Sequence, residues 1–386
     1  MSDNVYILGA ARTPIGSFQG SLASLPAPAL GAHAIRAALG TSDVADERID
    51  EVILGNVISA GLKQAPARQA MREAGLPDSC GALTVNKVCG SGMKATMLAH
   101  DLIRAGSARH VVCGGMESMT NAPYLLPGAR SGQRMGHGNV LDAMFTDGLE
   151  DAETGGAMGS FAQTTADAYQ LTREAMDEYA ISSLKRARAA MADGTLAGEI
   201  APIEIGSVTI DVDEQPGRAR EEKIPTLRPA FKADGTITAA NSSSISDGAS
   251  ALVIAGDEGL GGREPLARIV GHATHSLHPS EFTIAPVGAI GKLLDRLGWD
   301  TEDVDLFEIN EAFAMVTMIA IDELKLDRER VNIYGGACAQ GHPIGSTGSR
   351  LIVTLAHAMR RLNAKRGIAA LCIGGGEATA VALSRE

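Results

Sequence analysis

The sequence has few aromatic residues, no long apolar run and no basic cluster. Aromatic residues make up only 3% of its 386 residues, although 45% are hydrophobic. The longest apolar run, near residues 312–321, is about half of the roughly 18 residues that a membrane-spanning helix needs. There are 34 Lys and Arg against 46 Asp and Glu, a net charge of −12. We therefore expect a folded protein that neither spans a membrane nor binds nucleic acid.

Cysteines are few, odd in number and scattered. They are Cys80, Cys89, Cys113, Cys338 and Cys372. This pattern differs from the paired framework of a small secreted domain, and the N-terminus lacks the basic start and apolar core of a signal peptide. We therefore expect reduced thiols and a cytoplasmic location. Each cysteine has to be judged singly, as a core residue or as a chemical group.

Glycine is abundant, and the chain alternates between two kinds of segment. The 45 glycines are about 12% of the chain, against a usual ~7%. Short β-rich runs such as 5–8 and 51–54 alternate with alanine-rich stretches such as 30–39 and 93–105. This alternation predicts an α/β fold.

Segments of the first third recur, in the same order, in the last third. The matched pairs are 7–9 with 269–271, 50–56 with 304–310, 88–92 with 345–348, and 111–115 with 371–375. Their offset is nearly constant. The sequence therefore predicts two similar α/β halves of roughly 120 residues, related by a pseudo-twofold axis.

The segment between the halves, residues 121–243, has a different character and reads as an insertion. It contains a helical stripe of Met176, Ala180, Leu184, Ala187 and Met191. The residue before this helix, at 172, is a threonine suited to capping, and Asp-Gly at 193–194 is suited to ending it. Such a stripe could line a ligand groove, but this spacing more often marks a core face, and we predict core.

Cys89 has the setting of a reactive thiol. It lies between the β-like run 83–88 and the helix predicted from residue 93, and it is followed by Gly90-Ser91-Gly92. Free N–H groups at a helix start favour a thiolate, so we expect a lowered pKa, and the glycines would admit a substrate. The alternative is a small buried core residue.

Three other polar groups could share that chemistry. His342 stands in Gly341-His342-Pro343 and could activate a thiol or stabilise an oxyanion, although it could equally be an ordinary loop histidine. Cys372 ends a β-like run before three glycines, where a buried core role is the alternative. Asn310 precedes an apolar helix, where it could simply be a cap.

A metal site finds little support. His272, His275 and His278 are regularly spaced, but no Cys-x-x-Cys or His-Glu-x-x-His accompanies them. Pro279 and surroundings that read as a loop make display on one helix face improbable. We therefore expect no metal and no permanently bound cofactor.

Four motifs together resemble the thiolase family, and within it the acetyl-CoA acetyltransferases. They are Val88-Cys89-Gly90-Ser91-Gly92, Asn310-Glu311-Ala312-Phe313, Gly341-His342-Pro343 and Cys372-Ile373-Gly374-Gly375-Gly376. The resemblance covers essentially the whole chain. It implies two halves in a five-layer αβαβα arrangement with an inserted loop domain, which agrees with the internal repeat.

The resemblance also implies roles for these residues. Cys89 would be the acyl-accepting nucleophile and His342 would activate it. Cys372 would remove an α-proton from a second acetyl-CoA. His342 and a water held by Asn310 would stabilise the enolate, and the N–H groups of Cys89 and Gly374 would form a second oxyanion hole. The implied reaction is the ping-pong condensation of two acetyl-CoA to acetoacetyl-CoA and CoA, or the reverse thiolysis.

Acyl-CoA and CoA are thus the expected partners. The resemblance assigns their binding to Leu149, Met158, Phe231, Ala239, Ser243, Ala312 and Phe313. Arg218 or Arg220 could contact the nucleotide. Ala157 replaces a histidine common in short-chain members, so a broader 3-oxoacyl-CoA thiolase of fatty-acid degradation is the alternative activity. A noncatalytic acyl-CoA-binding protein is a further alternative, against which the four motif residues argue together.

The same resemblance implies boundaries and assembly. Residues 1–120 would form the N-terminal half, completed by about 244–264, and residues 265–386 the C-terminal half. Residues 121–243 would be the loop domain that binds CoA. A homodimer or homotetramer is expected, with Gly132 to Asn139 resembling a tetramerisation loop.

Overall fold

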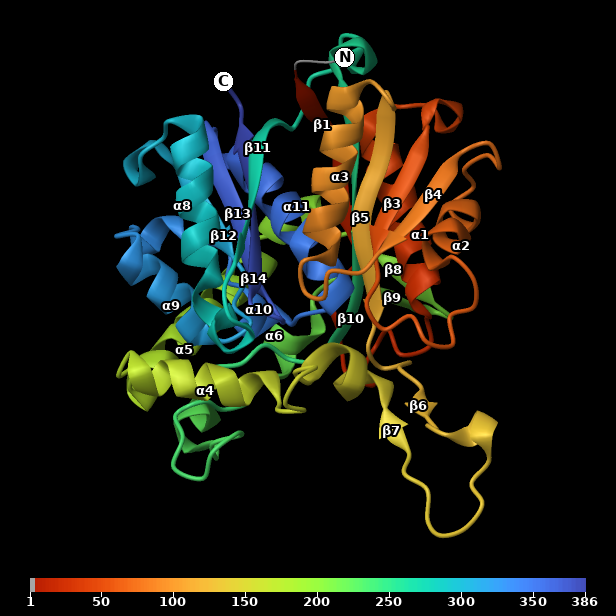
Figure 1. Cartoon of the computed structure of the whole chain (residues 1–386). Helices are drawn as coiled ribbons and strands as arrows, with labels where there is room; N and C mark the ends of the chain where they lie inside the picture. Colours follow the sequence, from red (N-terminus) through yellow and green to blue (C-terminus); the bar gives the residue numbers. More distant parts are fainter. Residues whose placement is uncertain (1–3) are drawn as a thin grey trace.

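The molecule is built on one mixed sheet. The computed structural model describes residues 4–386 (Figure 1). The strands of this sheet are β1 (Val5–Arg12), β2 (Gly16–Ser17), β3 (Glu51–Gly55), β4 (Gly81–Val85), β5 (His110–Ser118), β10 (Ser246–Gly256), β11 (Ala267–Ser276), β12 (Leu306–Ile309), β13 (Arg366–Ile373) and β14 (Glu377–Ser384). Their order is β12-β13-β14-β11-β1-β10-β5-β3-β4, with β2 also paired to β10.

Helices form three layers around the two halves of this sheet. They are α1 (Ala27–Ser42), α2 (Pro66–Glu73), α3 (Ser91–Ala105), α7 (Asp257–Leu260), α8 (Ala285–Leu297), α9 (Ala314–Glu323), α10 (Ala337–Gln340) and α11 (Ile344–Leu362). The central pair α3 and α11 contact each other, and between them they contact both halves of the sheet. Helices α1 and α2 cover the outside of the first half, and α8 covers the outside of the second (Figure 1). The expected αβαβα arrangement is confirmed.

The predicted repeat is visible strand by strand. The first half has the order β4-β3-β5-β10-β1, and the second has β12-β13-β14-β11. Within the described residues, the second half has no strand that corresponds to β4. At that position, an isolated parallel bridge joins Phe307 on β12 to Val331. Strand β1 shifts register just before Gly9, and β11 shifts register just before Gly271. The two halves join through antiparallel pairing of β1 with β11.

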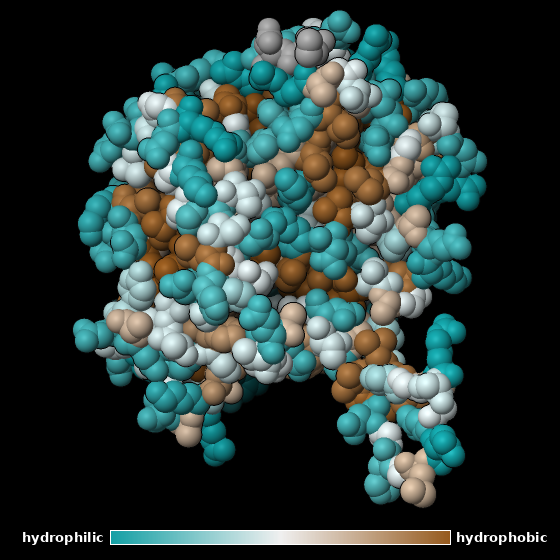
Figure 2. All heavy atoms as spheres, viewed as in Figure 1, coloured by the Kyte–Doolittle hydropathy of each residue, from teal (hydrophilic) through white to brown (hydrophobic). Residues whose placement is uncertain are grey.

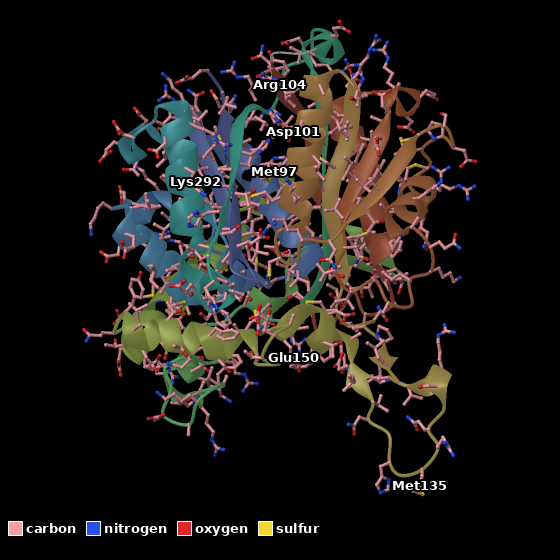
Figure 3. The ribbon with its side chains drawn as sticks, in the orientation of Figure 1. Met97, Asp101, Arg104, Met135, Glu150 and Lys292 are labelled. Atoms are coloured by element: carbon pink, nitrogen blue, oxygen red, sulfur yellow. The ribbon has the colours of Figure 1, made fainter. Side chains whose placement is uncertain are left out.

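Most of the inserted segment lies at one end of the two halves, whereas residues 203–210 pack against the first half (Figure 1). Its elements are β6 (Tyr124–Leu125), β7 (Leu141–Asp142), α4 (Met158–Ala168), α5 (Arg173–Ala192), β8 (Ile203–Ile205), β9 (Val208–Ile210) and α6 (Glu214–Arg218), with a π-helical turn at Phe145–Leu149 and short 3₁₀ turns. The loop between β6 and β7 extends away from the rest of the molecule, and Met135 lies at its tip (Figure 3).

Helix α5 is the one predicted from the apolar stripe. The Thr172 side chain accepts a hydrogen bond from the Ala175 N–H, so it caps the helix as predicted, and the helix ends at Ala192. Met176, Ala180, Leu184 and Ala187 are all buried. Met191, also part of the stripe, is only partly buried. The core prediction is therefore correct for the first four residues of the stripe.

Three apolar clusters correspond to the spaces between layers. One lies between the central helices and both halves of the sheet, one under α1 and α2, and one under α8. None of the helices within residues 4–386 is long and apolar enough to cross a lipid bilayer. All five cysteines are free thiols.

Candidate active site

A strained turn presents Cys89 between β4 and α3. Val88 has a φ of +47°, which is rare for a β-branched residue and costs energy. Its N–H donates to the Asn86 side chain at 3.0 Å, and its carbonyl accepts from the Ser91 hydroxyl at 2.7 Å. The Ser91 oxygen also accepts from the Lys87 N–H at 2.8 Å. These hydrogen bonds hold the turn that displays the cysteine.

The same turn lies against the end of β13, which carries Cys372. A Cβ atom on Gly90 would overlap the Ile373 side chain, so glycine is required for this approach. The Gly374 N–H forms a hydrogen bond to the Cys89 thiol that lowers its pKa. Charge on Cys89 in turn raises the pKa of Cys372, whose pKa burial already raises well above its ordinary value. Two sulfurs from distant parts of the chain are therefore neighbours.

The expectation of a lowered thiol pKa at Cys89 is wrong. Its side chain packs against two apolar clusters, and this burial raises the pKa of the thiol to about 11. The N–H groups of Gly374 and of Cys89 itself act in the opposite direction, and Glu117 adds to the increase. Desolvation of the thiolate outweighs the favourable backbone dipoles. The resting thiol is therefore neutral, and it would need a base in order to act as a nucleophile.

A prediction follows for the rate at which Cys89 is alkylated. Without substrate, its reaction with iodoacetamide should accelerate about tenfold per pH unit from neutral pH towards about 11, because only the thiolate reacts. Peptide mapping by mass spectrometry separates Cys89 from the other thiols. A rate that levels off near pH 7 would show that the pKa is lowered instead.

His342 is held through one of its two ring nitrogens. Its Nδ1 lies 2.6 Å from the Thr347 hydroxyl, which donates its own proton to the Pro343 carbonyl at 3.0 Å. This hydrogen-bond network assigns the proton to Nδ1 and leaves a lone pair on Nε2. The Nε2 atom is buried and has no hydrogen-bond partner within residues 4–386. Burial, with the nearby Arg350, lowers the pKa of His342 to about 3, so the imidazole is neutral and able to accept a proton.

The hydroxyl of Thr347 should matter for catalysis although sequence reasoning did not identify it. Replacing Thr347 by Val removes the acceptor of the His342 Nδ1–H, which costs about 1–3 kcal/mol at a buried site. If the loss falls on the transition state, kcat decreases roughly tenfold to a hundredfold with little change in KM. Thr347→Ser retains the hydroxyl and should restore most of the rate. Equal activity of the Val and Ser variants would contradict this positioning role.

Asn310 is not a helix cap. Helix α9 begins at Ala314 after Phe313, and no side chain caps it. Asn310 is fully buried, and in the described part of the chain neither its amide nitrogen nor its amide oxygen has a hydrogen-bond partner. An unpartnered buried amide is costly, so this side chain calls for a water or a substrate atom. The neighbouring Glu311 is instead fully engaged by donors that include Tyr179 and the Cys338 N–H.

The Glu117 carboxylate holds the segment after His342 in place through hydrogen bonds. This buried carboxylate accepts hydrogen bonds from the N–H groups of Val57, Ile58 and Gly345 and from the side chain of Asn56. Burial raises the pKa of Glu117 to about 7, although these N–H donors act to lower it. The bond to Gly345 anchors the first turn of α11, two residues beyond Pro343. In the sequence, the only indication that Glu117 anchors this turn is its position in a glycine-rich strand.

Several expected coenzyme A contacts pack with Cys372. Ala312 and Phe313 belong to the same buried apolar cluster as Cys372, and Met158 packs against that cluster. Met158 also borders Gly374, where an added Cβ would lie 3.3 Å from the Met158 sulfur. A side chain at position 374 would therefore crowd the space next to both thiols.

Two further positions line the same region from the inserted segment. Leu149 packs against a small apolar cluster that Cys89 also touches. The Phe231 and Phe313 rings meet edge to face, with their centroids 6.2 Å apart and an interplanar angle of 78°. Phe231 remains 37% exposed, so part of its ring is accessible to a ligand.

The remaining expected contacts are less closely tied to the thiols. Both the N–H and the hydroxyl of Ser243 donate to the Ala312 carbonyl at 3.0 Å. Ala239 is exposed. Arg218 is exposed on α6 and donates to Glu214 at 2.9 Å, and Arg220 is exposed as well.

Comparisons with known proteins show which proteins the chain is similar to. The model of the thiolase N-terminal domain matches residues 5–258, and that of the thiolase C-terminal domain matches residues 263–385. Proteins named acetyl-CoA acetyltransferase are similar to the chain. The one from Pseudomonas aeruginosa is 47% identical over 99% of this chain and 100% of its own length. The one from Escherichia coli is 45% identical over 99% of both.

A solved structure is similar over the full length. A thiolase from Ascaris suum, in complex with coenzyme A, superimposes with a TM-score of 0.95 at 42% sequence identity and covers 100% of both chains. Matched domains over nearly the whole chain, and relatives well above 30% identity, leave no doubt about descent. The chain belongs to the thiolase family.

Proposed function

We propose that the protein is an acetyl-CoA acetyltransferase that condenses two acetyl-CoA to acetoacetyl-CoA and CoA, and catalyses the reverse thiolysis. One observation carries the proposal. Separate segments of the chain supply two thiols, an imidazole nitrogen and an amide, and Cys372 lies close enough to Cys89 for charge on Cys89 to raise the pKa of Cys372. Within residues 4–386, the imidazole nitrogen and the amide have no hydrogen-bond partner. The names of the full-length relatives support acetyl-CoA as the substrate.

The first half-reaction transfers the acetyl group to Cys89. The lone pair on His342 Nε2 accepts the thiol proton while the sulfur attacks the thioester carbonyl. The N–H groups of Cys89 and Gly374 stabilise the oxyanion. The carbon–sulfur bond to CoA then breaks, and the departing CoA sulfur takes a proton from Cys372. The products are acetyl-Cys89, free CoA, a Cys372 thiolate and a His342 protonated on both nitrogens.

The second half-reaction uses the groups in the states that the first leaves. The Cys372 thiolate removes an α-proton from a second acetyl-CoA. The enolate oxygen accepts a hydrogen bond from the His342 Nε2–H and another from a water held by Asn310, the amide that has no partner. The enolate carbon attacks acetyl-Cys89, the carbon–sulfur bond breaks, and His342 returns its proton to Cys89.

The thiolysis chain-length profile tests the substrate. Ala157, where the family resemblance leads us to expect a histidine, forms the N-cap of α4 without a side-chain hydrogen bond. We expect kcat/KM for acetoacetyl-CoA to exceed that for a long-chain 3-oxoacyl-CoA, measured by loss of the 3-oxoacyl-CoA chromophore. Strong preference for the long chain would identify a broader thiolase of fatty-acid degradation. Absence of any acetyl adduct on Cys89 would instead indicate a noncatalytic acyl-CoA-binding protein.

The inserted segment, residues 121–243, is the part that we propose binds CoA. It supplies Leu149, Met158 and Phe231 to the region around the thiols. The two flanking portions of the chain would then contribute the catalytic groups and the sheet that holds them.

We also propose a homodimer or homotetramer. Strand β4 is the last strand of the sheet and carries Leu83, which is 44% exposed, so its edge can pair with another chain. Figure 2 shows hydrophobic residues gathered over α3 and the neighbouring strands of the first half. The extended loop that includes Gly132 to Asn139 suits a contact between dimers. A cytoplasmic location and a role in fatty-acid metabolism remain predictions.

A further inference from the structure

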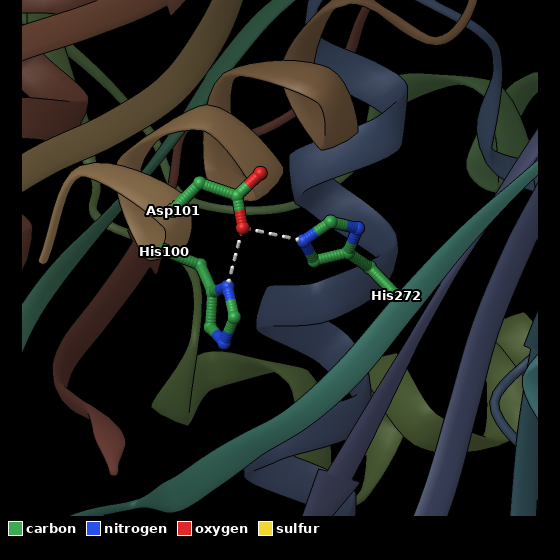
Figure 4. Close-up of side chains that lie close together, drawn as sticks. All are labelled: His100, Asp101 and His272. Atoms are coloured by element: carbon green, nitrogen blue, oxygen red, sulfur yellow. Dashed lines mark hydrogen bonds and ion pairs between the residues drawn. The ribbon is translucent and has the colours of Figure 1, made fainter. Parts of the chain in front are cut away.

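Two histidines and an aspartate meet far from the thiols. The Asp101 Oδ1 atom lies 3.0 Å from His100 Nδ1 and 2.9 Å from His272 Nε2 (Figure 4). The two imidazole rings meet edge to face, with centroids 5.1 Å apart. One ligand atom from each of the three residues falls within 4.8 Å of the other two. Nothing in the proposed condensation uses these groups.

The cluster joins two segments that lie far apart in the sequence. His100 and Asp101 are neighbours on α3, and His272 lies on β11. The expectation of loop-like surroundings for His272 is wrong, because β11 continues to Ser276. Residues 272 and 275 are an odd number apart on a strand, so they point to opposite faces. The sequence pattern of regularly spaced histidines therefore could not reveal the pairing of His272 with α3.

Two of the three separations between ligand atoms suit a small metal ion, and the third, between the two imidazole nitrogens, is within 4.8 Å. Zinc binds imidazole nitrogen at about 2.0–2.1 Å and carboxylate oxygen at about 2.0–2.2 Å, which in a tetrahedron places ligand atoms roughly 3.3 Å apart. The two nitrogen–oxygen separations here are only a few tenths of an ångström shorter. Asp101 is 54% exposed as a side chain, whereas those of His100 and His272 are 12% and 18% exposed. Solvent can therefore reach the cluster and supply a fourth ligand.

We propose that His100, Asp101 and His272 bind one divalent transition metal ion of the zinc, cobalt or nickel class. Imidazole and carboxylate ligands suit these ions. The ion would displace the ring protons that now face Asp101, and His100 Nδ1, His272 Nε2 and a carboxylate oxygen would coordinate it. Magnesium and calcium, which prefer oxygen ligands, should bind poorly.

Positive charges close to the cluster should lower its affinity for a metal ion. Arg104 lies close enough to lower the pKa of His100, although burial is the main cause of that shift. Figure 3 shows Asp101 and Arg104 on α3, with Lys292 on α8. Lys292 acts on His275, on the other face of β11. Arg104 is therefore the cation nearest to the proposed ion along α3, and removing its charge should tighten binding.

Position suggests a structural role for the ion. Helix α3 begins two residues after Cys89, and His100 lies about 14 Å further along its axis at 1.5 Å per residue. Strand β11 belongs to the second half of the sheet. A bound ion would thus tie the helix that follows the nucleophile to the other half of the molecule, without contacting substrate.

Metal titration of the full chain in its native assembly tests the proposal. Cys89 is first alkylated, so that the reactive thiol cannot bind metal. Zn²⁺ binding is then followed by calorimetry, and Co²⁺ binding by absorption, which distinguishes nitrogen and oxygen ligands from thiolates. We expect one ion per chain, with binding weakened at least about tenfold in both Asp101→Asn and His272→Gln. Arg104→Gln should bind more tightly.

His275→Gln is the matched control, because it removes an imidazole from the same strand but from the opposite face. It should bind the ion as the parent chain does. Unmodified Asp101→Asn and His272→Gln should keep the parent's thermal unfolding midpoint without metal and its thiolase rate, which shows that they fold. Equal binding by all variants, a thiolate spectrum, or no binding by the parent would overturn the metal site. None of these outcomes bears on the condensation.

Discussion

Replacing Cys89 by alanine is expected to abolish acetyl transfer. The variant loses the atom that we propose bonds to the acyl group, so both condensation and thiolysis should decrease by on the order of 10⁴-fold or more. Alanine is smaller and apolar, and the turn at Val88 is held by the backbone and the side chains of Asn86 and Ser91. The fold should therefore persist. Intact-mass measurement after mixing with acetyl-CoA should show no added acetyl group.

Cys80→Ala is the matched control for this variant. Cys80 is a buried thiol under α1 and α2, outside the proposed site. It should acquire the acetyl group at the parent rate. Rapid acetylation of the Cys89→Ala chain at another residue, with condensation retained, would refute the assignment of the nucleophile.

Replacing Cys372 by alanine should separate the two half-reactions. The variant keeps Cys89, His342 and the Gly374 N–H, so acetyl-Cys89 should still form, although more slowly because the departing CoA loses its proton donor. Condensation should fall by several orders of magnitude, because no base remains to remove the α-proton. Mass spectrometry of the acetylated chain and an assay of acetoacetyl-CoA formation measure the two steps independently.

An exchange experiment adds a third measurement for Cys372. In deuterated water the parent enzyme should exchange the methyl protons of acetyl-CoA, and Cys372→Ala should not. Near-normal condensation by this variant would contradict the proposed division of labour between the thiols. Failure to acetylate would point instead to a shared role in the first step.

The sequence predicts candidate site residues because short motifs carry their chemistry. Cys89, His342, Asn310 and Cys372 each stand beside glycines or at strand ends, where the backbone must turn sharply. The internal repeat predicted that segments near residues 89 and 345 begin corresponding helices. The structure shows those helices, α3 and α11, packed side by side in the central layer.

Other features depend on packing that local patterns do not encode. The pKa of Cys89 is set by how much apolar surface surrounds it, so a helix start alone predicted the wrong direction. Thr347 looked like one small residue in a glycine-rich helix start, and only the folded loop reveals its contact with His342. Likewise, His100 and His272 meet through tertiary structure alone.

Cross-linking the two proposed catalytic thiols tests the central claim most directly. A short bifunctional alkylating reagent such as 1,3-dibromoacetone, added at high pH without substrate, should bridge the two sulfurs. After digestion, mass spectrometry should identify one peptide pair joined through Cys89 and Cys372, and acetyl-CoA added beforehand should suppress it. Separate modification of each thiol without any bridge would mean that the sulfurs do not share a pocket, and the proposed mechanism would fail.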